Sequence, residues 1–196
     1  MRAAIGFRVH SGWAAAVTLG GSPDSPAILD RRKIQLVDTF AYAFRQPYHT
    51  AQKLSLPEAG GFLKTIRSDS CRLAVDGMRA VQSDLASVKC RLTCVALLLS
   101  SAHELPDLER ILASHALIHT ADGELFRDAI RHAAAREKTK LACITERELL
   151  GTAAKRFSCS PAALERRIAL LGKPLGPPWT QDQKLAALAA WLSLAG

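Results

Sequence analysis

The fold is decided by the first 37 residues, MRAAIGFRVHSGWAAAVTLGGSPDSPAILDRRKIQLV. Two apolar runs, residues 1–7 and 13–19, are separated by the polar residues 8–12 (RVHSG), and Gly20-Gly21 turns the chain again. Apolar runs bounded by glycine-containing turns are typical of strands, and residues 27–37 follow with partial alternation of apolar and polar side chains. The stretch therefore predicts a meander of three strands.

Helical and strand patterns alternate along the rest of the chain. Ser55, Pro57 and Glu58 combine a capping serine, an early proline and a glutamate three residues on, which predicts a helix to about residue 85, with a break considered at residues 60–61. Residues 91–100 are almost all apolar, as in a strand buried on both faces, so we expect this strand at the centre of the sheet. The other expected elements are a loop at 45–54, helices at 106–115, 122–136, 146–157, 160–171 and 180–194, a strand at 140–145, and a linker at 172–178.

Length and composition indicate one globular domain. The chain has 196 residues, 48% of them hydrophobic, which is enough for a substantial core. We expect a single domain over 1–196, with the meander at 1–38, a core of helices and strands at 55–157 and C-terminal helices at 160–195. No apolar run approaches the roughly 18 residues that cross a bilayer, and the N-terminus lacks a signal-peptide pattern, so we expect a cytoplasmic protein that binds no membrane.

Five cysteines are spread through apolar or helical stretches. An odd number at this spacing fits reduced, buried thiols better than a disulfide framework, and it lacks the pattern of a four-ligand metal site. The residues are Cys71, Cys90, Cys94, Cys143 and Cys159.

The net charge of +8 makes nucleic acid a candidate partner. The excess of basic residues lies towards the start and the end of the chain, whereas residues 101–150 are slightly acidic. A solubilising surface explains the same charge, and no platform of aromatic and basic residues is evident beside the basic clusters. The clusters that could meet phosphates are Arg31-Arg32-Lys33, Lys155-Arg156 and Arg166-Arg167.

The order of elements resembles the ribonuclease H-like fold, an α/β fold with a mixed sheet that opens with a three-strand meander and is flanked by helices. Residues 5–17 (IGFRVHSGWAAAV) look like the first hairpin of the Holliday-junction resolvase branch, in which an aspartate follows the glycine. Phe7 and Arg8 stand where that aspartate would be. Residues 182–191 (DQKLAALAAW) are similar to the last helix of that branch, which opens with metal-binding acids, and only Asp182 matches them.

Two-metal phosphoryl chemistry needs several carboxylates that converge on ions about 4 Å apart. The chain lacks the acid of the first strand, and the apolar strand at 91–100 has none, although Glu104 follows it. We therefore predict a catalytically degenerate domain that serves as a binding or interaction module, with nucleic acid as a candidate ligand. The first alternative is a Mg²⁺- or Mn²⁺-dependent nuclease or other phosphoester hydrolase, with a rearranged site drawn from Asp182, Glu124, Glu104 and His10. The second is a structural or assembly protein that buries exposed apolar faces against itself or a protein partner.

Two histidine motifs are further candidates. His10 and Ser11 lie in the first turn, where an imidazole and a hydroxyl could bind a phosphate, although small polar residues are expected in a hairpin turn in any case. His115 and His119 are four residues apart, as in a helical metal pair. The residues around them suggest a helix end and a turn, with Thr120 or Asp122 capping the next helix, so we assign no metal site from the sequence.

Overall fold

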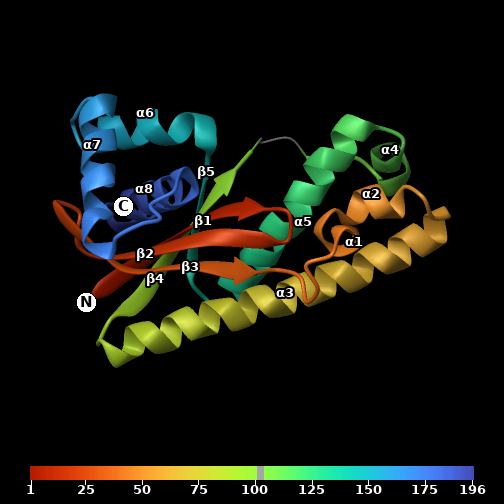
Figure 1. Ribbon diagram of the computed structural model, residues 1–196, viewed down its shortest axis with the longest axis horizontal. Helices are drawn as coiled ribbons and strands as arrows, with labels where there is room; N and C mark the ends of the chain where they lie inside the picture. The colour runs from red at the N-terminus through yellow and green to blue at the C-terminus, as the bar shows by residue number, and fades with distance from the viewer. Residues whose placement is uncertain (101–103) are drawn as a thin grey trace.

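The computed structural model describes residues 1–100 and 104–196, and its centre is a mixed five-stranded sheet (Figure 1). The predicted meander is confirmed by three consecutive strands, β1 (Arg2–His10), β2 (Trp13–Ser22) and β3 (Ser25–Gln35). β2 pairs antiparallel with β1 on one side and with β3 on the other. β4 (Arg91–Leu99) and β5 (Lys140–Thr145) add to β1 in parallel, which gives the strand order β3-β2-β1-β4-β5. β1 is therefore the middle strand, and our placement of residues 91–100 at the centre was wrong by one position, because β4 lies between β1 and β5.

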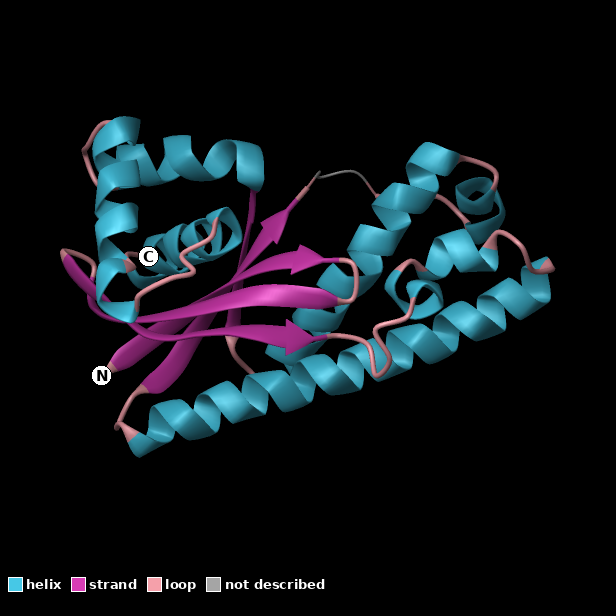
Figure 2. Ribbon diagram, viewed as in Figure 1, coloured by secondary structure: helices cyan, strands magenta, loops and turns pink. Residues whose placement is uncertain are grey.

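Helices cover both faces of the sheet (Figure 2). On one face, α3 (Leu56–Ser87) and α5 (His115–Arg136) pack on the apolar side chains of β1 that include Ile5 and Phe7. On the other face, α8 (Gln181–Leu194) packs on β1, β2 and β4, with α6 (Glu146–Arg156) and α7 (Pro161–Leu171) beyond it. The shorter helices are α1 (Tyr42–Arg45), α2 (Pro47–Ala51), α4 (Leu108–Leu112) and the 3₁₀ turn η1 (Lys173–Leu175).

Alternation along β1 separates the two faces chemically. Successive side chains of a strand point to opposite faces, so Ile5, Phe7 and Val9 enter the core under α3 and α5. Gly6 and Arg8 point to the side of α8. A methyl group added at Gly6 would lie 1.9 Å from the backbone oxygen of Ala186, so glycine is what lets α8 approach β1 this closely.

Three local predictions were wrong. Residues 45–54 are not a loop throughout, because the whole of α2 lies within this range, with Pro47 at its first position, and α1 ends at Arg45. Gly60-Gly61 does not interrupt α3, whose 32 residues are continuous. The helix expected from residue 122 begins at His115 instead, since Ser114 accepts a bond from the Leu117 amide and caps it. The capping boxes predicted for α3 and α8 are confirmed.

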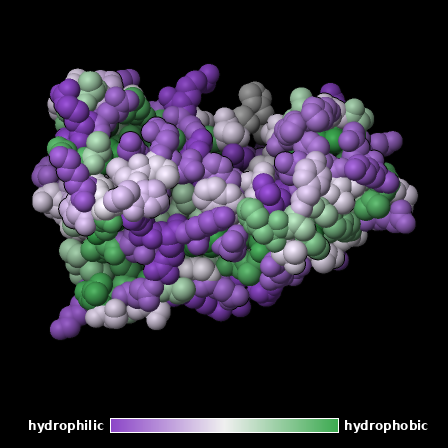
Figure 3. Space-filling view, viewed as in Figure 1, coloured by the Kyte–Doolittle hydropathy of each residue, from purple (hydrophilic) through white to green (hydrophobic). Residues whose placement is uncertain are grey.

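All five cysteines are free thiols, as predicted, but Cys143 is exposed and Cys71 and Cys159 are only partly buried. Within residues 1–100 and 104–196, no helix combines the length and apolar character needed to cross a membrane. Hydrophilic residues cover much of the face shown in Figure 3, and hydrophobic residues form smaller patches on it. The large hydrophobic side chains that are exposed come from different parts of the chain: Met1, Phe40, Tyr42, Leu54, Leu56, Val88 and Leu170.

Candidate functional site

The carboxyl ends of three parallel strands bring charged side chains to one edge of the sheet. β1, β4 and β5 run in the same direction, so the end of β1 at His10 and the end of β5 at Thr145 face the same edge. Glu146 follows β5 at once as the first residue of α6. Thr180 caps α8 and places Asp182 in its first turn, over the side of β1 that carries Arg8. Residues distant in the sequence therefore meet at this edge.

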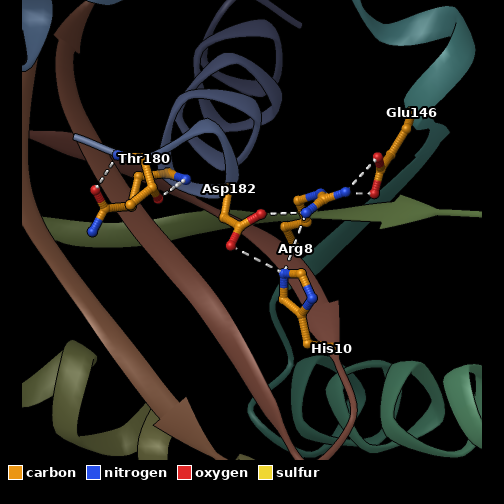
Figure 4. Close-up of polar contacts among 6 residues, drawn as sticks. Arg8, His10, Glu146, Thr180 and Asp182 are labelled. Atoms are coloured by element: carbon orange, nitrogen blue, oxygen red, sulfur yellow. Dashed lines mark hydrogen bonds and ion pairs between the residues drawn. The ribbon is translucent and has the colours of Figure 1, made fainter. Parts of the chain in front are cut away.

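Arg8 lies between two carboxylates (Figure 4). Its Nε donates to Glu146 Oε1 at 2.9 Å and its Nη2 donates to Glu146 Oε2 at 3.1 Å, a bidentate ion pair. Its Nη1 donates to Oδ1 of Asp182. The three side chains are 25%, 34% and 26% exposed, respectively. One guanidinium thus neutralises part of the charge of both acids, and we call Arg8, His10, Glu146 and Asp182 the Arg8 cluster.

Burial and the neighbouring charges shift the pKa values of Arg8 and His10. Burial disfavours the charge on Arg8, but the hydrogen bonds and charges of Glu146 and Asp182 outweigh it and raise the pKa of the guanidinium. Burial lowers the pKa of His10 below 6.5, and the neighbouring Arg8 acts in the same direction, while Asp182 opposes both. Arg8 is therefore a permanent cation, and the neutral imidazole of His10 is favoured at pH 7.

His10 has two partners within reach of one ring nitrogen. Its Nε2 lies 3.3 Å from Arg8 Nη1 and 3.3 Å from Asp182 Oδ2. A neutral ring satisfies one of these at a time: a bare nitrogen accepts from Arg8, and a protonated one donates to Asp182. The ring also stacks on Trp13, with centroids 4.4 Å apart and planes 13° apart. His10 therefore joins the Arg8 cluster to an aromatic surface.

The donor set of the Arg8 cluster does not fit a pair of divalent metal ions. Both carboxylates at this edge, Glu146 and Asp182, direct oxygens at the Arg8 guanidinium. Arg8, one of the two residues at the place of the aspartate in the resolvase-like pattern, is a cation, which repels a metal ion instead of ligating it. We derive no metal-dependent step for this cluster.

The other two acids proposed for a rearranged site have different surroundings. Glu124 lies on α5, where it accepts from Arg127 Nη1 at 2.9 Å and from Arg131 Nη1 at 3.1 Å. Glu104 is exposed in the segment before α4. Of the three acids named from the sequence, Asp182 is the one that belongs to the Arg8 cluster.

A platform of aromatic and basic side chains adjoins the Arg8 cluster. The Nζ of Lys33 lies 4.6 Å from the ring centroid of Trp13 and 4.6 Å from that of Phe40, and the Arg45 guanidinium carbon lies 4.3 Å from the Phe40 centroid. Lys33, Ala15 and Arg8 are in register across β3, β2 and β1, so they lie on one face. Trp13, Lys33, Phe40 and Arg45 form what we call the stacking platform. The sequence predicted no platform of aromatic and basic residues beside the basic clusters, and this prediction was wrong for the cluster that contains Lys33.

Of the other basic residues singled out from the sequence, Arg31, Arg32 and Arg167 make contacts within the fold. Arg31 donates to the carbonyls of Leu175, Gly176 and Pro178, and so holds the segment before α8. Arg32 pairs with Asp30 and Asp84. Arg167 lies over the ring of Trp191 at 4.5 Å, and Arg166 is exposed.

Ser11 is half-buried in the turn between β1 and β2. The following residue, Gly12, has a φ of 82°, which favours glycine. The turn brings His10 and Trp13 into register.

No protein-family model and no curated protein matches the sequence, whereas solved structures match the fold. A Thermus thermophilus RuvC in complex with a Holliday junction substrate superposes with a TM-score of 0.53 at 10% identity, over 98% of this chain and 92% of that chain. A second T. thermophilus RuvC structure gives 0.50 at 8% identity, over 97% and 92%. The protein thus has a ribonuclease H-like α/β fold, as the sequence predicted.

Sequence reasoning missed Glu146 and three members of the stacking platform, Trp13, Phe40 and Arg45. An acid that follows a strand at the carboxyl edge of a parallel sheet is a recognisable signal for Glu146, because ligand sites gather at that edge. Trp13 was interpreted as a packing residue, since its neighbours are small, but it is only partly buried and stacks on His10. Phe40 follows the meander, and its place beside Lys33 depends on the path of the chain after β3.

Proposed function

We propose that residues 1–196 form a single ribonuclease H-like module that binds nucleic acid and does not cleave it. The observation that carries this proposal is the Arg8 guanidinium, which bonds to Glu146 and Asp182 at the edge of the sheet where the resolvase-like pattern would place metal-binding acids. Metal-assisted phosphoryl transfer requires free carboxylates. Because Arg8 is paired with both carboxylates, the cluster supports a role without catalysis over a catalytic one.

The stacking platform supports nucleic acid as the ligand. Binding of single strands combines aromatic faces, on which bases stack, with cations that track the phosphates. Phe40 is 45% exposed, and Lys33 and Arg45 lie against its ring. A base that stacks on Phe40 would leave its phosphate close to two cations. We propose Phe40 as the stacking residue and Lys33 and Arg45 as the phosphate contacts.

The test is binding of fluorescently labelled single- and double-stranded DNA and RNA across a salt series, with and without Mg²⁺ or Mn²⁺, followed by inspection of the strands. We expect binding that weakens with salt and leaves the strands intact. Phe40→Ala should weaken single-strand binding by about 1–3 kcal/mol, or about 5- to 150-fold. Lys33→Gln should lower the magnitude of the slope of log affinity against log salt by about one.

Lys140→Gln is the matched control, since Lys140 is an exposed lysine at the start of β5, at the opposite edge of the sheet. It should bind as the wild type does, apart from a small general charge effect. Metal-dependent cleavage would refute the proposal of a silent module and restore the nuclease alternative. Failure to bind any of the four ligands at low salt would refute nucleic acid as the partner.

A further inference from the structure

Three histidines from two helices converge near α1, α2 and α4, on the side of the molecule opposite α6 and α7 (Figure 1). His49 lies on α2, and His115 and His119 lie on the first turns of α5. One ring nitrogen of each lies within 4.8 Å of those of the other two. His115 and His119 are separated by four residues in a continuous helix, which places both rings on one side of α5.

Asp122 fixes the orientation of His49. It follows His119 by three residues, so it lies on the same side of α5, and it is 4% exposed. Its Oδ2 lies 2.6 Å from His49 Nδ1, and its Oδ1 accepts from the Tyr48 amide at 2.7 Å. The carboxylate therefore holds the proton of His49 on Nδ1, which leaves a lone pair on Nε2, on the other side of the ring. A histidine that donates one ring nitrogen to a carboxylate is the usual arrangement of a metal ligand.

The spacing of the nitrogens fits a first-row divalent metal. With metal–nitrogen bonds of about 2.0–2.1 Å and tetrahedral angles, two imidazole nitrogens on one ion are about 3.3 Å apart. The Nε2 atoms of His115 and His119 are 3.0 Å apart. The ring centroids are 4.5 Å apart for His115 and His119, 4.5 Å for His49 and His119, and 5.4 Å for His49 and His115. Both His115 and His119 are exposed, so small side-chain movements can close the remaining separation.

We propose that His49, His115 and His119 bind one divalent transition-metal ion of the zinc class, with Asp122 as the residue that positions His49. Three neutral imidazoles suit Zn²⁺ and its neighbours in the first row, and poorly suit Mg²⁺ or Ca²⁺. The fourth position of the metal faces solvent and takes a water molecule. The ion joins α2 to α5, so it stabilises the short helix that precedes α3. This site is separate from the Arg8 cluster and does not depend on the proposed function.

The test uses the full chain, with any affinity tag removed and bound metal stripped by a chelator. Isothermal titration with Zn²⁺ should give one site per chain, and Zn²⁺ should raise the unfolding temperature. Co²⁺ should give the visible spectrum of a tetrahedral site with nitrogen and oxygen ligands, without thiolate charge-transfer bands from the cysteines. Two-dimensional proton–nitrogen spectra of the imidazoles should show shifts at His49, His115 and His119.

The variant His115→Gln/His119→Gln should lose the site and the rise in unfolding temperature, while its exposed positions allow it to fold. His132→Gln is the matched control, because His132 is exposed on the same helix and lies outside the cluster. Asp122→Asn should weaken Zn²⁺ affinity by about 10- to 100-fold. If the wild type binds no Zn²⁺, or if the double variant binds it equally well, the metal site is refuted.

Discussion

Removal of the Arg8 guanidinium tests the electrostatic account of the sheet edge most directly. Arg8→Met keeps an unbranched side chain of similar reach and deletes three donated hydrogen bonds, two to Glu146 and one to Asp182. Both carboxylates then remain partly buried without their cation. We expect the protein to fold with a lower free energy of unfolding.

The expected loss in the free energy of unfolding of Arg8→Met follows from the burial of the three charged side chains. Exposed ion pairs contribute about 0.2–1 kcal/mol, whereas breaking a fully buried pair costs about 3–5 kcal/mol. The Arg8, Glu146 and Asp182 side chains are 25%, 34% and 26% exposed, which places the cluster between these limits. With solvent screening taken into account, we expect a loss of about 2–3 kcal/mol.

The assay is urea unfolding at pH 7, with the slope of unfolding free energy against urea compared between variants. Arg147→Met is the matched control, since Arg147 is exposed on the same helix as Glu146, and it should change stability by no more than about 0.5 kcal/mol. In the Glu146→Gln/Asp182→Asn background, Arg8→Met should cost less than it does in the wild type. A loss no larger than that of Arg147→Met would refute the reasoning.

Three further predictions concern the same edge. Gly6→Ala should destabilise the protein by about 3 kcal/mol or more, measured by urea unfolding, because the added methyl group meets the Ala186 backbone oxygen and α8 must move. His10 should titrate below pH 6.5 by NMR, and lower still in Asp182→Asn. Since the unfolded chain then binds more protons, the contribution of His10 to the free energy of unfolding should fall as the pH falls below 6.5, and His10→Asn should remove that dependence. Arg8→Asp should create a site of three carboxylates, so in the His115→Gln/His119→Gln background Mn²⁺ should raise the unfolding temperature of the protein with Arg8→Asp and not that of the protein with Arg8.

The sequence predicted most of the fold because its strands and helices carry strong local signals. Glycine-bounded apolar runs marked β1 and β2, and capping boxes at Ser55 and Thr180 marked the starts of α3 and α8. The errors arose where tertiary contacts outweigh local pattern. Asp122 looked like a helix cap, but in the fold it is a buried residue within α5 that bonds to α2.

The candidate site was predicted only in part, because its members are brought together by strand direction and register. Asp182 and His10 were named, and Arg8 was recognised as the residue in place of an acid. Their contact required knowledge that α8 lies over β1, and the approach of Glu146 required β5 to be parallel to β4. Neither arrangement is encoded in a short stretch of sequence.

The charge balance of the Arg8 cluster restricts where a nucleic acid would lie under the proposed function. One guanidinium faces two carboxylates, and His10 favours its neutral form, so the cluster carries a net negative charge that repels phosphate. Lys33 and Arg45 carry positive charge beside exposed Phe40, and Lys33 lies two strands away from Arg8 in the same register, with Ala15 between them. In the proposed binding mode, a strand on this face would run along β3 and the segment before α1, beside Lys33 and Arg45. With an arginine at position 8, both carboxylates of the cluster are ion-paired, so under the proposed function the favourable phosphate position lies away from them.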